Sequence, residues 1–178
     1  MGIDSMQKDK NNLLITRSSK HFMTGGILLM VLLVVVDQLT KQLASTYVSG
    51  NGVSVIPGVF RLLYVENQGA AFGLFKDRRF FFILIAVMFL AAGAALLHHL
   101  ADKNPPALLR IAGFTLMAGA AGNLIDRIFL GYVRDFLYVE LIDFPVFNAA
   151  DIFITVSAAV IALHLLISDT GEREPNAD

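Results

Sequence analysis

The longest uncharged segment of the chain, residues 80–97, limits its possible folds more than any other feature. The segment has 18 consecutive residues without a charge, and all except Gly93 are apolar. As a helix it is about 27 Å long at 1.5 Å per residue, which matches the hydrocarbon core of a bilayer. Hydrophobic residues make up 56% of the chain and charged residues 16%, unlike ordinary soluble domains. The sequence therefore predicts a membrane protein.

Three further segments have the length of a membrane span but contain polar residues. They cover about residues 22–44, 107–126 and 147–167, so the predicted fold class is a mostly α, polytopic membrane protein with four transmembrane helices. An apolar run at residues 27–36, behind a basic N-terminus, is similar to a signal peptide. Because no small-residue cleavage site follows it closely, we interpret it as a retained anchor.

Four spans place both ends of the predicted membrane domain, residues 21–168, on one side of the membrane. Residues 1–20 carry four basic residues and are interpreted as a poorly ordered cytoplasmic tail, and residues 169–178 as a second one. Basic residues divide seven to seven between the two sides, so this orientation rests on the N-terminal tail alone. We expect residues 45–78 and 128–146 to lie outside.

The segment between the first two spans has a different pattern. Residues 53–67 form two β-prone stretches separated by Pro57-Gly58, which predicts a small β-rich element on the outer membrane face. The residues from Phe72 to Arg79 mix Phe and Leu with basic side chains, as a short interfacial helix would.

The polar residues of the spans and of the first loop gather at one membrane face. It is the outer face if the N-terminus is inside, because odd-numbered spans run outward and even-numbered spans return. The residues at this face are Asp37, Lys41, Asn67, Gly69, Asn123, Asp126, Arg127, Asn148 and Asp151. The four histidines, His21, His98, His99 and His164, fall at the opposite face.

This distribution excludes several kinds of chemistry. With no histidine near the outer carboxylates, neither a Ser-His-Asp triad nor a zinc site is expected. The chain has no cysteine, hence no thiolate nucleophile, and we expect no metal and no cofactor. A net charge of −1 leaves no basic excess for binding nucleic acid. The chemistry that remains possible is that of two carboxyls beside water, in which one carboxyl holds a proton while the other acts as a base.

The outer carboxylates differ in their sequence neighbours. Asp37 and Lys41, four residues apart, fit an ion pair as well as they fit a functional site. Asp126, beside Arg127, is more simply part of a structural polar network. Asp151 has no basic residue within a helical turn.

The remaining candidates lie outside the spans or among small residues. Asp135 lies in an apolar-rich segment, where burial would raise its pKa. Glu140 and Asp143 are expected to be solvated in a loop. Gly119, among alanines, predicts close contact between helices, with room for a substrate as a secondary effect.

Five short blocks occur in an order typical of one known family. They are DQLTK at 37–41, NQGAAF at 67–72, AGAAGNLIDR at 118–127, VRDF at 133–136 and FNAAD at 147–151. Together they resemble the lipoprotein signal peptidases, or type II signal peptidases, over about residues 25–167. The resemblance implies an aspartyl endopeptidase of the bacterial inner membrane. Such enzymes remove signal peptides from diacylglyceryl-modified prolipoproteins by cutting before the lipidated cysteine.

The matching blocks also imply roles for individual residues. The aspartates of VRDF and FNAAD, Asp135 and Asp151, correspond to the catalytic pair, and Asp37 with Lys41 would support the structure. The residues that would bind substrate or support the site are Asn67, Gly69, Gly119, Asn123, Asp126, Arg127 and Asn148. We expect a monomer in contact with membrane phospholipid, with the active site at the periplasmic face and both termini in the cytoplasm.

Two positions depart from the family pattern. Ala118 stands where glycine is frequent, which removes a little space. Arg134 stands where valine is common, and a cation beside a catalytic aspartate is expected either to lower the pKa of that aspartate or to contact lipid headgroups.

Two other classes of protein also carry charged residues within spans. A transporter needs polar groups at the midplane and beyond, often in repeated halves, whereas here they stop at one face and we find no repeat. A structural subunit would use the polar clusters only to bind neighbouring helices. Cleavage of a lipidated substrate by the purified protein would separate a peptidase from both.

Overall fold

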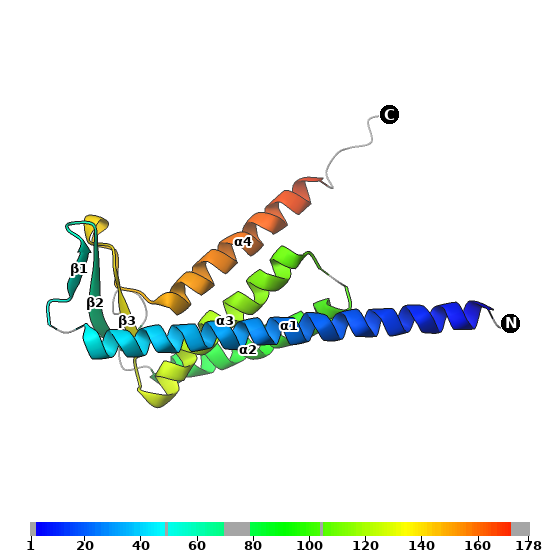
Figure 1. Ribbon diagram of the computed structural model, residues 1–178, viewed down its shortest axis with the longest axis horizontal. Coiled ribbons are helices and arrows are strands. Elements are labelled where there is room, and N and C mark those ends of the chain that lie inside the picture. Colours follow the sequence, from blue (N-terminus) through cyan, green and yellow to red (C-terminus); the bar gives the residue numbers. More distant parts are fainter. Residues whose placement is uncertain (1–2, 49, 70–78, 104, 172–178) are drawn as a thin grey trace.

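The computed structural model describes residues 3–48, 50–69, 79–103 and 105–171 (Figure 1). Four long helices make up most of this part: α1 (Ile3–Tyr47), α2 (Arg79–Ala101), α3 (Ala107–Phe129) and α4 (Ala149–Gly171). The spans long and apolar enough to cross a membrane are His21–Tyr47 of α1, the whole of α2 and α3, and Ala149–Ser168 of α4. The prediction of a mostly helical protein with four spans is confirmed.

Helix α1 begins well before the predicted span. It starts at Ile3, so residues 3–20 are helical where the sequence predicts a poorly ordered tail. These residues include neither glycine nor proline, and an existing helix gains one hydrogen bond for each residue it adds. The structure therefore describes these residues as a continuation of α1. At the other end of the chain, α4 continues to Gly171, within the predicted tail 169–178.

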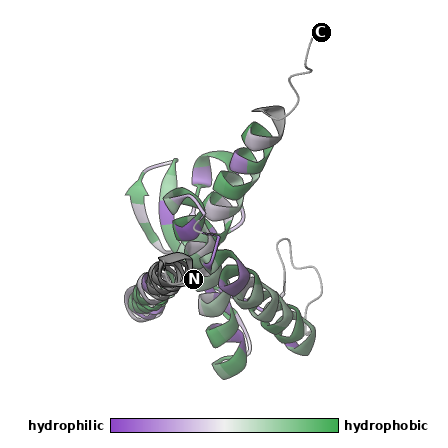
Figure 2. Ribbon diagram, turned by 90° about the vertical axis from the view of Figure 1, so that its right-hand side faces the viewer, coloured by the Kyte–Doolittle hydropathy of each residue, from purple (hydrophilic) through white to green (hydrophobic). Residues whose placement is uncertain are grey.

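The helices present apolar surface on their outer sides. Figure 2 shows apolar residues along all four, and large side chains such as Leu28, Phe80 and Leu163 are more than half exposed. In water such a surface would be costly, whereas lipid solvates it and leaves the helical backbone hydrogen bonds intact. The exposed apolar surface is what a multi-pass membrane protein requires.

Helix α3 packs against each of the other three helices and holds most of the buried helical residues. Small residues allow this close packing. A Cβ atom at Gly119 would lie 2.5 Å from the backbone oxygen of Ala150 on α4, and one at Gly122 would collide with the Asp37 carboxylate on α1. The predicted close helix contact at Gly119 is thus confirmed.

A three-stranded antiparallel sheet, in the order β1-β2-β3, lies at one end of the bundle (Figure 1). Strands β1 (Val53–Ile56) and β2 (Phe60–Asn67) are the predicted β-rich element, and they turn at Pro57-Gly58, where Gly58 has a φ of 72°. Strand β3 (Val133–Tyr138) was not predicted. It follows α3 directly and pairs with β2, so that Val65 lies opposite Asp135.

The chain between β3 and α4 returns towards the sheet. It passes through a short 3-10 helix, η2 (Glu140–Ile142), and a bridge between Leu137 and Phe147 then leads it into α4. The ends of α1 and α3, the start of α4 and the sheet therefore meet at one end of the molecule (Figure 1). The predicted interfacial helix at 72–79 lies outside the described residues except for Arg79, which begins α2.

Candidate active site

Asp135 and Asp151 come from different elements, β3 and α4, and Asn148 joins them. The Asn148 side-chain amide donates to Asp135 Oδ1 at 2.6 Å, and its backbone N–H donates to Asp151 Oδ2 at 3.1 Å. In return the backbone N–H of Asp151 donates to Asn148 Oδ1 at 3.0 Å. This reciprocal pair is a capping box, which satisfies the free N–H groups at the start of α4. A single fully buried asparagine thus caps α4 and holds both carboxyls.

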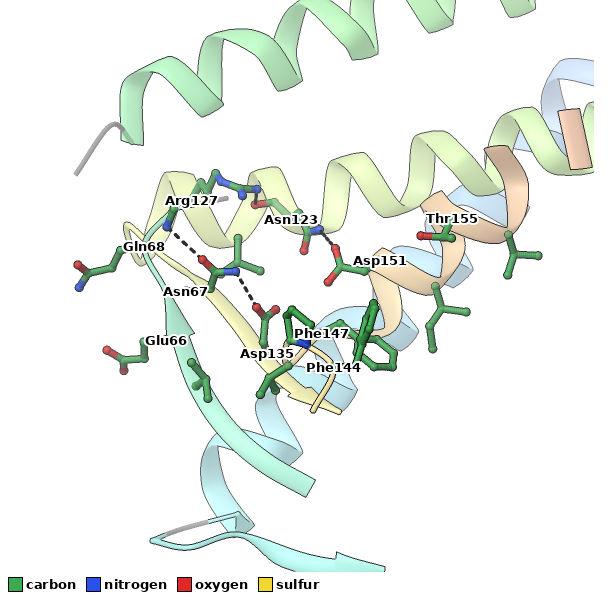
Figure 3. Close-up of a pocket in the computed structure, with 17 residues that line it drawn as sticks. Glu66, Asn67, Gln68, Asn123, Arg127, Asp135, Phe144, Phe147, Asp151 and Thr155 are labelled. Carbon is green, nitrogen blue, oxygen red and sulfur yellow. Dashed lines mark hydrogen bonds between the residues drawn. The ribbon is translucent and has the colours of Figure 1, made fainter. Parts of the chain in front are cut away.

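Two more asparagines complete the hydrogen bonding of these carboxyls. Asn67 on β2 donates to Asp135 Oδ2 at 2.9 Å, and Asn123 on α3 donates to Asp151 Oδ1 at 2.8 Å (Figure 3). We call these five residues, Asn67, Asn123, Asp135, Asn148 and Asp151, the amide cluster. Among the described residues, neither of its carboxylates forms an ion pair with a lysine or arginine.

The amide cluster borders a pocket of about 930 Å³. The pocket wall is polar near the two carboxyls and mostly apolar beyond them, where the loop before α4 and the first turns of α4 form it. The lining residues are Val65, Glu66, Asn67, Gln68, Gly69, Asn123, Arg127, Val133, Asp135, Phe144, Pro145, Val146, Phe147, Asp151, Ile152, Thr155 and Val156. Such a pocket suits a substrate with a polar group next to an apolar one.

Burial raises the pKa of Asp135 from 3.8 to about 6, because the charged form loses hydration. The hydrogen bond from Asn67 opposes this rise, and the nearby charge of Asp151 adds to it. The expectation from sequence, that burial raises the pKa of Asp135, therefore agrees with the structure. A carboxyl with a pKa of about 6 can both hold and release a proton near neutral pH.

A second buried group lies beside the amide cluster and contains opposite charges. We call it the ionic cluster: Asp37, Lys41, Asp126 and Arg134. Lys41 Nζ lies 2.9 Å from Asp37 and 3.7 Å from Asp126, and Arg134 Nη2 lies 2.8 Å from Asp126. Lys41 also donates to Asn123 Oδ1 at 2.8 Å, which links the two clusters. The structure therefore shows Asp37 and Lys41 as an ion pair.

Arg134 neither lowers the pKa of Asp135 nor contacts lipid headgroups, which are the two roles expected from the sequence. Neighbouring residues of a strand point to opposite faces, so its side chain is directed away from Asp135 and towards Asp126 and Gln38. It is 8% exposed, so it is not free to contact headgroups, and the pKa of Asp135 is raised rather than lowered. Asp126 likewise pairs with Arg134 and Lys41, not with its sequence neighbour Arg127.

Arg127 lines the pocket instead. Its guanidinium donates to the backbone oxygen of Asn123 at 3.4 Å and lies 5.2 Å from the centre of the Phe82 ring. Among the described residues it has no carboxylate partner within ion-pair distance. Its other N–H groups have no hydrogen-bond acceptor within the described ranges of the chain.

The other predicted residues fall into two groups. Gly69 lines the pocket, and its N–H orients Asn67 by donating to Oδ1 at 3.1 Å. Gly119, Asp126 and Asn148 lie behind the pocket wall and do not line it. These three can support the site from outside its lining.

The expectation that both loop carboxylates are solvated holds for Asp143 but not for Glu140. Glu140 pairs with Arg61 at 3.1 Å, and both side chains are about one-third exposed, so the expectation is wrong for Glu140. Asp143 is exposed and accepts a hydrogen bond from the Tyr138 hydroxyl at 2.6 Å. Both lie outside the pocket lining.

Sequence reasoning missed two features of the site. Gln38 connects the helices by donating to Asp37, Asp126 and the backbone oxygen of Gly122. The N-x-x-D spacing of Asn148 and Asp151 is a capping-box signal at a helix start and could have been read from the sequence.

No group of three or more histidine, aspartate or glutamate side chains in the described part of the chain could hold a metal ion.

Comparison with known proteins gives a consistent result. The family model described as signal peptidase (SPase) II matches residues 29–167. The lipoprotein signal peptidase of Symbiobacterium thermophilum is 43% identical over 145 residues, which cover 80% of this chain and 94% of that protein. The lipoprotein signal peptidase of Clostridioides difficile is 35% identical over 148 residues, covering 83% of this chain and 98% of that protein.

Solved structures of bacterial membrane enzymes, determined by the in meso method, have the same fold. One at 2.3 Å resolution superposes with a TM-score of 0.78 and 32% identity, covering 88% of this chain and 96% of the other. Another at 1.9 Å resolution gives a TM-score of 0.73 and 34% identity, covering 82% and 94%.

Proposed function

Because this chain belongs to the signal peptidase II family, and is a membrane protease that cleaves signal peptides from prolipoproteins, we propose that Asp135 and Asp151 are its catalytic pair. The observation that carries this proposal is the hydrogen bonding of the amide cluster. Its two carboxyls border one pocket, share Asn148 and are held by neutral amides. Carboxyls held in this way can exchange protons during a reaction, whereas those of the ionic cluster are paired with cations.

In the proposed mechanism, Asp135 holds a proton and Asp151 accepts one from water. The water oxygen attacks the scissile carbonyl carbon while Asp135 protonates the carbonyl oxygen, which gives a tetrahedral diol. Asp151 then passes its proton to the leaving nitrogen, the C–N bond breaks, and a diol hydroxyl returns a proton to Asp135. Both carboxyls end in their starting forms, so the cycle can repeat.

The proposed substrates are diacylglyceryl-modified prolipoproteins, cut before the lipidated cysteine. The apolar part of the pocket supports this proposal, since Phe144, Phe147 and Val156 offer acyl chains a surface beside the carboxyls. Each acyl methylene removed from water contributes about 0.8 kcal/mol. Purified protein should therefore cleave lipidated precursor much faster than the unlipidated form, and equal rates would contradict this substrate.

We further propose an inner-membrane protein with both termini in the cytoplasm and the pocket at the periplasmic face, beside membrane phospholipid. The basic N-terminal residues support this orientation. Reporter fusions after Asn104 should behave as cytoplasmic and those after Gly50 as periplasmic, and the reverse pattern would contradict it. We propose a monomer because one chain supplies every residue of the amide cluster.

Proteolysis by the purified protein tests the central proposal. Wild-type protein in detergent or lipid should convert a lipidated precursor, and Asp135→Asn and Asp151→Asn should not. Asp143→Asn is the control, because this exposed carboxylate lies outside the pocket and should be nearly silent. Substantial conversion by either variant of the pair would move the catalytic role to another carboxylate.

A further inference from the structure

The pocket extends from the two carboxyls along helix α4, where Thr155 is part of its wall. Thr155 lies four residues after Asp151, so the two side chains share one face of the helix. At 1.5 Å per residue it lies about 6 Å further along the span. Its neighbours Ile152 and Val156 also line the pocket and are 42% and 56% exposed. Thr155 therefore stands where the polar end of the pocket gives way to an apolar one.

The Thr155 hydroxyl has no hydrogen-bond partner in the part of the chain that the structure describes. In helix α1 the hydroxyls of Thr40, Ser45 and Thr46 donate to backbone oxygens three or four residues earlier, at 2.8 to 2.9 Å. Helical threonines and serines commonly bond in this way. None of the hydrogen bonds among the described residues includes the Thr155 side chain. Figure 3 shows its oxygen on the side of α4 that faces Asp151.

A hydroxyl at this position needs an acceptor once the pocket is filled. A bound ligand displaces water, and an unpaired hydroxyl in apolar surroundings is costly. Val146, Phe147, Ile152 and Val156 offer no polar side chain, so on the apolar side of Thr155 the acceptor has to come from the ligand. A ligand with a carbonyl just before its apolar part would supply it.

We propose that the Thr155 hydroxyl donates a hydrogen bond to an ester carbonyl of the substrate's diacylglyceryl group and so determines specificity for it. The inference rests on the proposed function, which places the scissile peptide between Asp135 and Asp151. The lipidated cysteine follows that peptide, and its side chain carries the glycerol, so the esters lie between the scissile bond and the acyl chains. Thr155 occupies the corresponding position in the pocket, between the carboxyls and the apolar wall.

Two matched substrates test this inference. One is a precursor peptide whose cysteine carries a diacylglyceryl group, and the other carries a dialkylglyceryl group of equal chain length, in which ether linkages replace the esters. Wild-type protein should prefer the ester by about 3- to 10-fold in kcat/KM, mostly through KM, which is the size expected of one neutral hydrogen bond. Thr155→Val should remove this preference by losing activity on the ester alone, and Thr155→Ser should keep it.

Ser157→Ala is the matched control, because Ser157 is a buried hydroxyl on the same helix outside the pocket lining. It should leave the ester-to-ether ratio unchanged. An equal loss on both substrates in Thr155→Val would indicate a structural role and overturn the inference, as would an unchanged ratio or a wild-type enzyme without preference. Failure of wild-type protein to cleave either substrate would instead overturn the proposed function, and the inference with it.

Discussion

The ionic cluster and the amide cluster lie side by side at the sheet end of the bundle, and each contains two aspartates, all buried except the partly exposed Asp151. In the ionic cluster, Asp37 and Asp126 contact Lys41 and Arg134 at ion-pair distance. In the amide cluster, Asp135 and Asp151 receive N–H donors from asparagines and from the backbone of Asn148. The residue types are similar, but the formal charge of the partners differs.

Under the proposed function, the same kind of side chain supports the fold in one cluster and takes part in the reaction in the other. A carboxylate beside a buried cation is bound to that cation, because protonation would leave the cation unpaired. A carboxylate held by amides has no such constraint, so burial can bring its pKa near the working pH, as it does for Asp135. Lys41 connects the two clusters through Asn123 and so fixes their relative position.

The largest expected effect is a loss of turnover, and we expect it only from substitutions in the amide cluster. Asp135→Asn and Asp151→Asn should each lower kcat by a factor on the order of 10³ or more, since asparagine cannot exchange the proton, and the double variant should be scarcely worse. Asp126→Asn should behave differently, because it leaves Arg134 without its carboxylate and so reduces the amount of folded protein. The measurements are conversion of lipidated precursor and abundance in the membrane.

The stability of Asp135→Asn is a second test of the contrast between the amide cluster and the ionic cluster. The pKa of Asp135 is raised in the folded protein, so its ionisation removes stability as pH rises from about 4 through about 6. Asparagine cannot ionise, and the variant should therefore accumulate at least as well as wild type at neutral pH. Low abundance of Asp135→Asn with normal abundance of Asp126→Asn would reverse the roles given to the two clusters.

The next largest effect should be on stability. Lys41→Met leaves the buried Asp37 carboxylate without its cation and Asp126 with Arg134 alone, which should cost about 3–5 kcal/mol of unfolding free energy. Adding Asp37→Asn should recover part of it, because the unpaired charge is removed. Thermal unfolding in detergent measures both variants, with the exposed Lys103→Met as control. A stable Lys41→Met protein would mean that the ionic cluster is not needed for the fold.

A smaller effect is expected at Arg127, whose guanidinium faces the pocket. Arg127→Lys should lower kcat/KM by about 10-fold, because an ammonium cannot reproduce planar, bidentate contacts to substrate carbonyls. Arg110→Lys is the matched control. Arg110 also lies over a ring, 5.7 Å from that of Phe22, but on the first turn of α3, away from the pocket. Equal effects of the two substitutions would reduce Arg127 to a membrane anchor.

The smallest expected effect is a shift in pH dependence. If Asp135 must be protonated, activity falls as pH rises through its pKa of about 6. The Asn67 hydrogen bond lowers this pKa, so Asn67→Ala should raise it and move the alkaline limb of kcat/KM to higher pH, by about one unit or less. Asn51→Ala, at an exposed position, should leave the limb in place. A shift to lower pH would contradict the proton-holding role of Asp135.

Several features of the fold follow from the sequence alone. Long apolar segments fix the number of spans, because a helix of about 20 apolar residues is stable in the bilayer without help from distant residues. The turn at Pro57-Gly58 likewise separates β1 from β2 through local backbone preferences. For the same reason the sequence places the histidines and the carboxylates at opposite ends of the spans.

Other features could be settled only by contacts between distant segments. Strand β3 is short and its pairing depends on β2, some 70 residues earlier in the chain. The partners of Asp126 could not be read from its neighbours, because Arg127 turns to the pocket while Arg134 and Lys41 come from β3 and α1. Sequence blocks suggested Asp135 and Asp151 through a family resemblance. These carboxyls differ from those of Asp37 and Asp126 in the charge of their partners. The packing of the folded chain decides which partners each carboxyl meets.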